Sequence, residues 1–195
     1  IELWWITYLG DFYQNGTITT LQNLGERSTS HLEQDLLQFS GRRPLGLILP
    51  SLYSEVHTAA LPAIVQELQS IPYLSQIVVG LDRATQSEYR HALAFFSKLP
   101  QHHRVLWNDG PRLKAIDTRL REAGLAPTEL GKGRNVWYCM GYTLATGRAE
   151  AIALHDCDIT TYSRELLARL IYPVANPNFK YKFCKGFIHI IEMFI

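Results

Sequence analysis

The sequence has few cysteines and no pairing pattern among them. Its three cysteines are Cys139, Cys157 and Cys184, and no two of them form a C-x-x-C pair. This argues against a disulfide framework and leaves no cysteine cluster for a structural zinc ion. Reduced thiols of this kind are typical of cytoplasmic proteins, so we expect a cytoplasmic location.

Long apolar runs and a dominant charge are also missing. No run approaches the roughly 18–20 apolar residues that cross a bilayer, and the net charge is only +1. We therefore expect neither a membrane nor nucleic acid as a partner. The apolar start, residues 1–9, is short, contains Glu2 and has no basic lead, which is not typical of a signal peptide. The sequence also lacks an initiator Met, and we expect it to be a fragment.

What the sequence does contain is a regular alternation of apolar runs and helix-period segments. Its 195 residues, 47% hydrophobic and 19% charged, fit one ordered domain. A short extended piece is expected over 17–21, strands over 45–49, 77–81, 104–107 and 151–155, and helices over 31–39, 55–68, 86–98, 113–123, 135–146 and 164–171. Ser54 is the expected N-cap of helix 55–68, in which Pro62 must lie in the first turns or bend the helix. The alternation predicts a three-layer α/β fold with a mainly parallel sheet.

Two carboxylates one residue apart follow the last of these strands. If the backbone stays extended, Asp156 and Asp158 point to the same side and can aim at one hard cation, Mg²⁺ or Mn²⁺, with a substrate phosphate. A turn or helix cap is the other interpretation of such a pair. Polar residues also end the other strands, at Ser51, Asp82 and 108–109. Because ligands bind at the carboxyl ends of parallel strands, the ends together predict one site.

A glycine-flanked lysine precedes helix 135–146. The segment Gly131-Lys132-Gly133 exposes backbone N–H groups beside a positive charge, which suits a phosphate. It is not a P-loop, because Ala126 and Gly133 stand where that motif needs Gly and Ser or Thr. An ordinary loop is the alternative, but a diphosphate held between Lys132 and a metal becomes plausible together with the downstream aspartates.

A rival interpretation comes from the same aspartates. Residues 156–160 match the D-x-D-x-T motif of haloacid-dehalogenase-type phosphatases, in which the first Asp is the nucleophile. In those enzymes the motif ends the first strand of the core, and further motifs follow on later strands. Here it ends the fourth expected strand and little sequence follows it, which disfavours a phosphatase.

In the order of these features, the sequence resembles nucleotide-sugar glycosyltransferases of the GT-A fold. It resembles more closely the glucosyl-3-phosphoglycerate synthases and related family-2-like enzymes. The segments that carry the resemblance are 18–21, 49–55, 77–79 with Asp82, 131–133 before the helix containing Trp137, 156–158 and 185–187. The family transfers glucose from an NDP-glucose to 3-phosphoglycerate with retention of configuration. Two departures are Ser54, in place of a family acidic residue, and the apolar end 188–195, which does not look like the family's continuation.

The resemblance implies roles for particular residues. The expected NDP-sugar site consists of Pro50, Leu52, Glu55, Asp82, Lys132 and Asp156, and the expected divalent cation, Mg²⁺ or Mn²⁺, is held by Asp158 with Asp156. It identifies no catalytic residue. The implied domains are an N-terminal segment 1–43, a nucleotide-sugar-binding GT-A domain 44–187 and an atypical tail 188–195.

The function implied is a metal-dependent, retaining hexosyltransferase that moves a hexose, glucose by the resemblance, to a small phosphorylated acceptor such as 3-phosphoglycerate. The family's acceptor-binding residues lie mostly beyond segment 185–187, so we expect a C-terminally truncated chain with weak transfer. The alternative is a nucleotide-sugar-binding module without transfer activity. A homodimer is the expected assembly.

Overall fold

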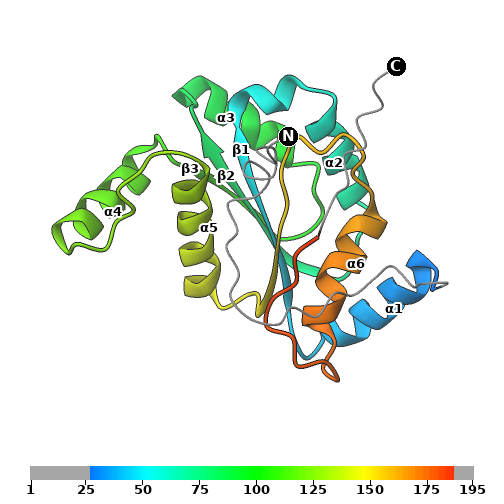
Figure 1. Cartoon of the computed structure of the whole chain (residues 1–195). Helices are drawn as coiled ribbons and strands as arrows, with labels where there is room; N and C mark the ends of the chain where they lie inside the picture. Colours follow the sequence, from blue (N-terminus) through cyan, green and yellow to red (C-terminus); the bar gives the residue numbers. More distant parts are fainter. Residues whose placement is uncertain (1–26, 187–195) are drawn as a thin grey trace, which may run out of the picture.

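A computed structural model describes residues 27–186 and shows four parallel strands in the order β3-β2-β1-β4 (Figure 1). The strands are β1 Leu45–Leu52, β2 Leu74–Asp82, β3 His103–Trp107 and β4 Ala151–Leu154. The helices are α1 Thr29–Ser40, the short 3₁₀ helix η1 Tyr53–His57, α2 Ala60–Leu68, α3 Gln86–Phe96, α4 Pro111–Glu122, α5 Lys132–Thr146 and α6 Arg164–Ala175. The predicted α/β fold with a mainly parallel sheet is confirmed.

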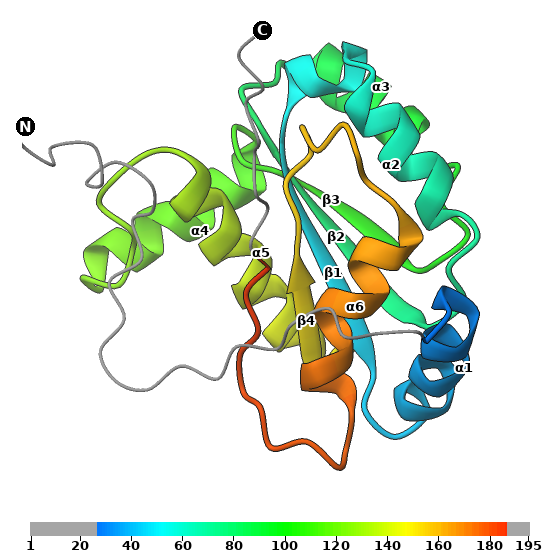
Figure 2. The ribbon, with the colours of Figure 1, turned by 45° about the vertical axis from the view of Figure 1, so that its right-hand side comes forward.

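Helices cover both faces of the sheet and make three layers (Figure 2). On one face α1, α2, α3 and α6 bury a large apolar core that includes Leu36, Ile64 and Phe96. On the other face α5 packs over the centre of the sheet, where Cys139 meets Ile48 and Val78. Helix α4 projects beyond α5, away from the sheet, and none of its residues is buried.

The glycine at position 80 fixes the distance between α5 and the sheet. A Cβ atom at Gly80 would lie 1.7 Å from Oδ1 of Asn135 and 2.6 Å from Sγ of Cys139, so only glycine permits this close approach. Asn135 Nδ2 donates a 2.8 Å hydrogen bond to the Gly80 carbonyl oxygen. The first turn of α5 is thereby held over the end of β2.

The predicted helix over 55–68 is wrong in one respect. The chain instead forms η1 and then begins α2 at Ala60, so Ser54 lies inside η1 and is not the N-cap. The reason is local, because Glu55 Oε2 accepts a 2.9 Å hydrogen bond from the Leu52 N–H and tightens this turn into a 3₁₀ helix. Pro62 is the third residue of α2, within the first turn, where its missing N–H breaks no helical hydrogen bond.

Two other helix boundaries differ from the expected ones. Helix α5 begins at Lys132 rather than Asn135, because Gly131, at φ 130°, makes the sharp entry and leaves Lys132 in the first turn. Helix α6 continues through Pro173 to Ala175 instead of ending at Ile171. The other expected helices and strands agree within a few residues.

The division of the chain into three parts stays a prediction. Helix α1 lies within the expected segment 1–43, yet Leu32 and Leu36 join the same core as the β strands. Arg164 of α6 also holds Glu33 of α1 through two hydrogen bonds of 2.6 and 2.8 Å. The expected extended piece 17–21 and the tail 188–195 lie outside the described residues. Within residues 27–186, no helix is long and apolar enough to cross a membrane.

Candidate functional site

The four strands end at the same edge of the sheet, as the sequence predicts. Leu52 of β1 pairs with Asp82 of β2, and Leu81 pairs with Trp107 of β3. On the other side of β1, Ile48 pairs with Leu154. Since all pairs are parallel, the residues that follow these strands meet at the carboxyl edge, where open α/β sheets bind ligands.

The N-terminus of α5 reaches this edge and brings a lysine to an aspartate. Lys132 Nζ lies 2.5 Å from Oδ1 of Asp156, and the two side chains are 56% and 46% exposed. Gly131, the N-cap residue, offers no side chain to the first N–H groups of the helix. A free helix start with an exposed ammonium group beside it suits an anionic ligand.

Asp82 forms the second charged cluster at the edge. Its Oδ1 lies 4.0 Å from the guanidinium of Arg134, which is also in the first turn of α5, and the side chains are 11% and 15% exposed. Asp82 Oδ1 also accepts a 3.3 Å hydrogen bond from the Arg83 N–H. Arg83 has a left-handed backbone with φ 54°, which is uncommon for residues other than glycine and often marks a functional turn.

Asn108, one of the polar residues that end strand 104–107 in the sequence, is a further buried residue at this edge. It directly follows β3, is 4% exposed, and its N–H donates to the Leu81 carbonyl oxygen at 2.9 Å. Neither polar atom of its side chain has a hydrogen-bond partner, and Nε of Arg134 also has none. Buried polar groups without partners cost free energy, and among the described residues Tyr73, Gln76, Gln101 and His155 also have such atoms. The only sequence signal was the polar ending of strand 104–107.

Glu55 and Asp109 mainly hold the turns around the site. Besides the Leu52 N–H, Oε2 of Glu55 accepts a 3.0 Å hydrogen bond from the Ser51 hydroxyl. Oδ2 of Asp109 accepts a 3.0 Å bond from the Ala84 N–H and so ties the loop after β3 to the loop after β2. In this structure these carboxylates position backbone.

The backbone does not stay extended through both metal candidates, so of the two interpretations of this pair the structure shows the turn. Strand β4 ends at Leu154, and the chain turns at Cys157 and Asp158, which leaves Asp158 exposed and Asp156 half-buried. No group of three or more His, Cys, Asp or Glu side chains within residues 27–186 could hold a metal ion. Two carboxylates alone still suit Mg²⁺ or Mn²⁺, which complete their coordination with water and phosphate oxygens. The Cys157 side chain between them is 1% exposed and belongs to the apolar core, and its burial raises the pKa of the thiol.

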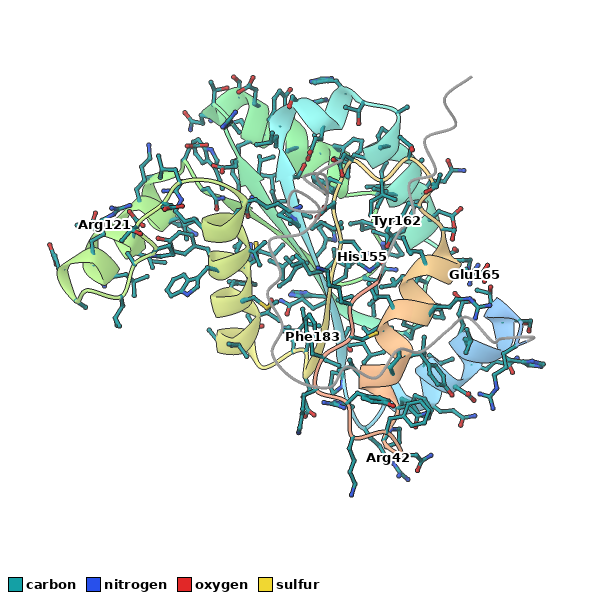
Figure 3. The ribbon with its side chains drawn as sticks, viewed as in Figure 1. Arg42, Arg121, His155, Tyr162, Glu165 and Phe183 are labelled. Atoms are coloured by element: carbon teal, nitrogen blue, oxygen red, sulfur yellow. The ribbon has the colours of Figure 1, made fainter. Side chains whose placement is uncertain are left out.

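His155 is turned away from this edge. Its ring is 3% exposed, and Nδ1 lies 3.1 Å from the hydroxyl of Tyr162, on the side of the sheet that carries α6 (Figure 3). Burial lowers the pKa of His155 to about 4, against a smaller opposing effect of Asp156. The imidazole is therefore neutral near pH 7.

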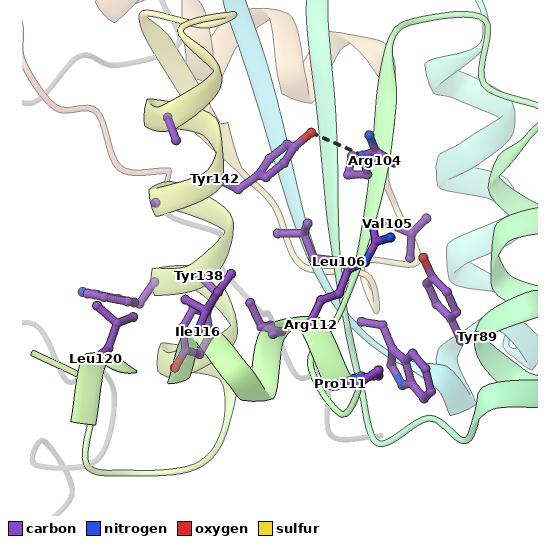
Figure 4. A pocket seen from close by; sticks show the side chains of 16 residues that line it. Tyr89, Arg104, Val105, Leu106, Pro111, Arg112, Ile116, Leu120, Tyr138 and Tyr142 are labelled. Atoms are coloured by element: carbon purple, nitrogen blue, oxygen red, sulfur yellow. Dashed lines mark hydrogen bonds between the residues drawn. The ribbon is translucent and has the colours of Figure 1, made fainter. Parts of the chain in front are cut away.

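A hollow of about 900 Å³ lies elsewhere, between β3, α4 and α5 (Figure 4). Its lining is mostly apolar and includes Leu106, Ile116, Leu120 and Trp137. None of the residues that the sequence analysis assigns to the NDP-sugar or to the cation lines this hollow. An apolar hollow is unsuited to a diphosphate, so the strand-end edge remains the candidate site.

No protein-family profile matches the chain. Two curated proteins named glucosyl-3-phosphoglycerate synthase are similar to it. The one from Persephonella marina is 50% identical over 179 residues, which cover 92% of this chain and 44% of that protein. The one from Methanococcoides burtonii is 39% identical over 187 residues, which cover 94% of this chain and 45% of that protein. The chain thus spans less than half the length of these relatives.

A crystal structure of glucosyl-3-phosphoglycerate synthase from Mycobacterium tuberculosis, in complex with Mn²⁺, UDP and glucosyl-3-phosphoglycerate, is also similar. Its TM-score is 0.49 at 16% identity, and the match covers 81% of this chain and 47% of that chain. Another crystal structure of the Mycobacterium tuberculosis protein gives a TM-score of 0.49, also at 16% identity, and the match covers 75% of this chain and 45% of that chain. Because these scores lie below 0.5, the sequence relatives alone support the function proposed below.

Proposed function

This chain is a relative of the glucosyl-3-phosphoglycerate synthases, and on that basis we propose that it carries the donor site of a metal-dependent glucosyltransferase of the GT-A type. The donor is an NDP-glucose and the acceptor is 3-phosphoglycerate, with retention of the anomeric configuration. The observation that supports this most is the pairing of Lys132 with Asp156 at the start of α5, at the carboxyl edge of the sheet.

The pair suggests how the diphosphate of the donor is bound. Lys132 and Asp156 neutralise each other in the ligand-free structure. When an NDP-sugar and a cation bind, the two side chains exchange partners, so that Lys132 contacts the diphosphate while Asp156 and Asp158 face the cation. A divalent cation, Mg²⁺ or Mn²⁺, supplies positive charge for the diphosphate that leaves the sugar.

The residues of the chain supply the rest of the donor-side chemistry. The lysine ammonium and the free N–H groups at the start of α5 stabilise negative charge on the departing diphosphate, which is electrostatic catalysis. Buried Pro50 and half-buried Leu52 form the floor beside Asp82, since Leu52 and Asp82 are paired across the strands. Glu55 holds the turn after β1 in place.

A second candidate is a nucleotide-sugar-binding module without transfer activity. It is kept because the chain spans less than half the length of its relatives, and no acceptor site is assigned among residues 27–186. A homodimer, a cytoplasmic location and the absence of nucleic-acid and membrane partners remain part of the proposal. They do not affect the donor chemistry.

The two candidates differ in turnover. The chain is incubated with Mn²⁺ and UDP-glucose or GDP-glucose, with and without 3-phosphoglycerate, and released nucleoside diphosphate and glucosyl-3-phosphoglycerate are measured. Acceptor-dependent release supports the transferase. Donor binding without such release supports the binding module, and absence of both binding and release would refute the donor site.

A further inference from the structure

The two aspartates of the candidate cation site alternate with side chains that are buried in the core. Asp156 is half-buried and Asp158 is exposed, whereas His155 and Cys157 are both buried. Cys157 belongs to the large apolar core, and the ring of His155 lies on the same side of the sheet, toward α6. The positions of the two carboxylates therefore depend on how firmly their buried neighbours are held.

A hydrogen bond between two buried side chains closes the loop that carries the aspartates. Nδ1 of His155 lies 3.1 Å from the hydroxyl of Tyr162, and the two rings meet edge to face with their centroids 5.4 Å apart (Figure 3). His155 is the first residue after β4, and Tyr162 lies just before α6. The bond thus bridges the base of the loop from one end to the other.

Both ends of this bridge lie on fixed backbone. The N–H of His155 donates to the Ile48 carbonyl oxygen at 3.1 Å and so continues the pairing of β4 with β1. Arg164, two residues after Tyr162, donates its N–H to Oε2 of Glu67 in α2 at 3.1 Å. Because closing a loop restricts the conformations of the residues inside it, the bridge limits how far the two aspartates can move.

A hard cation held by two carboxylates is sensitive to where those carboxylates lie. Mg²⁺ and Mn²⁺ prefer octahedral sets of oxygen ligands, and hydrogen bonds outside the ligand set orient the ligands and raise metal affinity. If the loop samples other conformations, the apparent affinity for the cation falls in proportion to the fraction of molecules in the competent conformation. A bond that keeps the loop closed therefore strengthens cation binding without touching the cation.

We infer that Tyr162 is a positioning residue of the cation site, and that it acts through His155 to hold Asp156 and Asp158 where one divalent cation contacts both. The inference rests on the proposed function, because that function assigns the cation to the two aspartates. The bridge contributes little to global stability, since the hydrogen bond at Nδ1 of His155 is offset by its buried Nε2, which has no partner.

The test titrates Mn²⁺ into the whole chain at a fixed concentration of UDP-glucose or GDP-glucose, whichever binds the unchanged chain. Electron paramagnetic resonance follows the loss of free Mn²⁺. In Tyr162→Phe the half-saturating Mn²⁺ concentration should rise roughly 2- to 10-fold, the scale of one lost hydrogen bond. Tyr73→Phe is the matched control, because Tyr73 is buried in the same core and its hydroxyl has no partner. This variant should bind Mn²⁺ like the unchanged chain.

Two substitutions at His155 separate positioning from stability. His155→Leu fills the buried space but has no atom that can bond Tyr162, whereas His155→Asn is smaller and keeps polar atoms near the place of Nδ1. A structural role alone predicts the same order of the two variants in melting temperature and in Mn²⁺ affinity. The positioning role predicts opposite orders: His155→Leu melts at the higher temperature because it leaves less empty space, and His155→Asn binds Mn²⁺ more tightly.

Each outcome bears on a definite claim. An unchanged Mn²⁺ requirement in Tyr162→Phe overturns the inference and leaves the proposed function intact. An equal rise in Tyr73→Phe, or the same order of the two His155 variants in both measurements, also overturns it. If the unchanged chain binds no nucleotide sugar in the presence of Mn²⁺, the proposed function fails and the inference fails with it. A rise in Tyr162→Phe and His155→Leu that is absent from Tyr73→Phe supports both.

Discussion

Replacing Lys132 by alanine separates its role in binding from any role in folding. In the structure Lys132 pairs with Asp156 at 2.5 Å, but both side chains are about half exposed. Exposed ion pairs contribute roughly 0–1 kcal/mol, so the melting temperature of Lys132→Ala should hardly change. A charged hydrogen bond to a diphosphate is worth more, about 1.5–3 kcal/mol. The dissociation constant of an NDP-sugar should therefore rise by roughly 10- to 150-fold.

The assay is calorimetric titration of UDP-glucose and GDP-glucose in the presence of Mn²⁺, with circular dichroism to follow melting. Lys114→Ala is the control, since Lys114 is exposed on α4 and its loss changes the net charge equally. Asp156 loses its partner in Lys132→Ala, so Mn²⁺ alone should bind at least as well as before. If both lysine variants bind the donor like the unchanged chain, Lys132 does not contact the diphosphate, and the segment 131–133 is an ordinary helix entry.

Three further predictions follow from the structure. Asp158→Asn keeps the shape of the side chain but removes the charge that a hard cation needs, so Mn²⁺ should no longer strengthen donor binding. The circular dichroism spectrum should be unchanged. If Mn²⁺ still strengthens donor binding, Asp158 is not a ligand of the cation. Gly80→Ala should destabilise the protein by about 1–3 kcal/mol in urea unfolding, because its Cβ would collide with α5, whereas Gly141→Ala on α5 meets nothing within 4 Å and should be neutral or stabilising. Tyr138→Phe removes the hydroxyl that donates a hydrogen bond to Asp117 of α4, so amide hydrogen exchange in α4 should accelerate. Tyr142→Phe removes the hydroxyl that accepts a hydrogen bond from Arg104, and it should leave the exchange rates in α4 unchanged.

Much of the strand-end edge could be predicted from the sequence because it depends on chain order and parallel pairing. Apolar runs followed by Asp82 and Asp156, and a glycine-flanked Lys132 just before an expected helix, are brought to one edge by the topology of any parallel sheet. The contact of Lys132 with Asp156 extends this prediction to side chains that are far apart in sequence.

The remaining features depend on partners that the sequence does not reveal. The place of Glu55 in the NDP-sugar site stays a prediction; in this structure its carboxylate accepts a hydrogen bond from the Leu52 N–H, and the same bond splits the predicted helix 55–68. Asn108 stands out only because both of its polar side-chain atoms are buried without partners, which depends on tertiary packing. An extended backbone is the condition under which Asp156 and Asp158 point to the same side, whereas the chain turns at 157–158, which is the other interpretation of the pair.

The most direct test of the donor site is a crystal structure of this chain grown with Mn²⁺ and UDP, with the manganese located by anomalous scattering. The account predicts manganese in contact with the carboxylates of Asp156 and Asp158, and the diphosphate beside Lys132 at the start of α5. Manganese and diphosphate bound anywhere else, including the hollow between β3, α4 and α5, would contradict it.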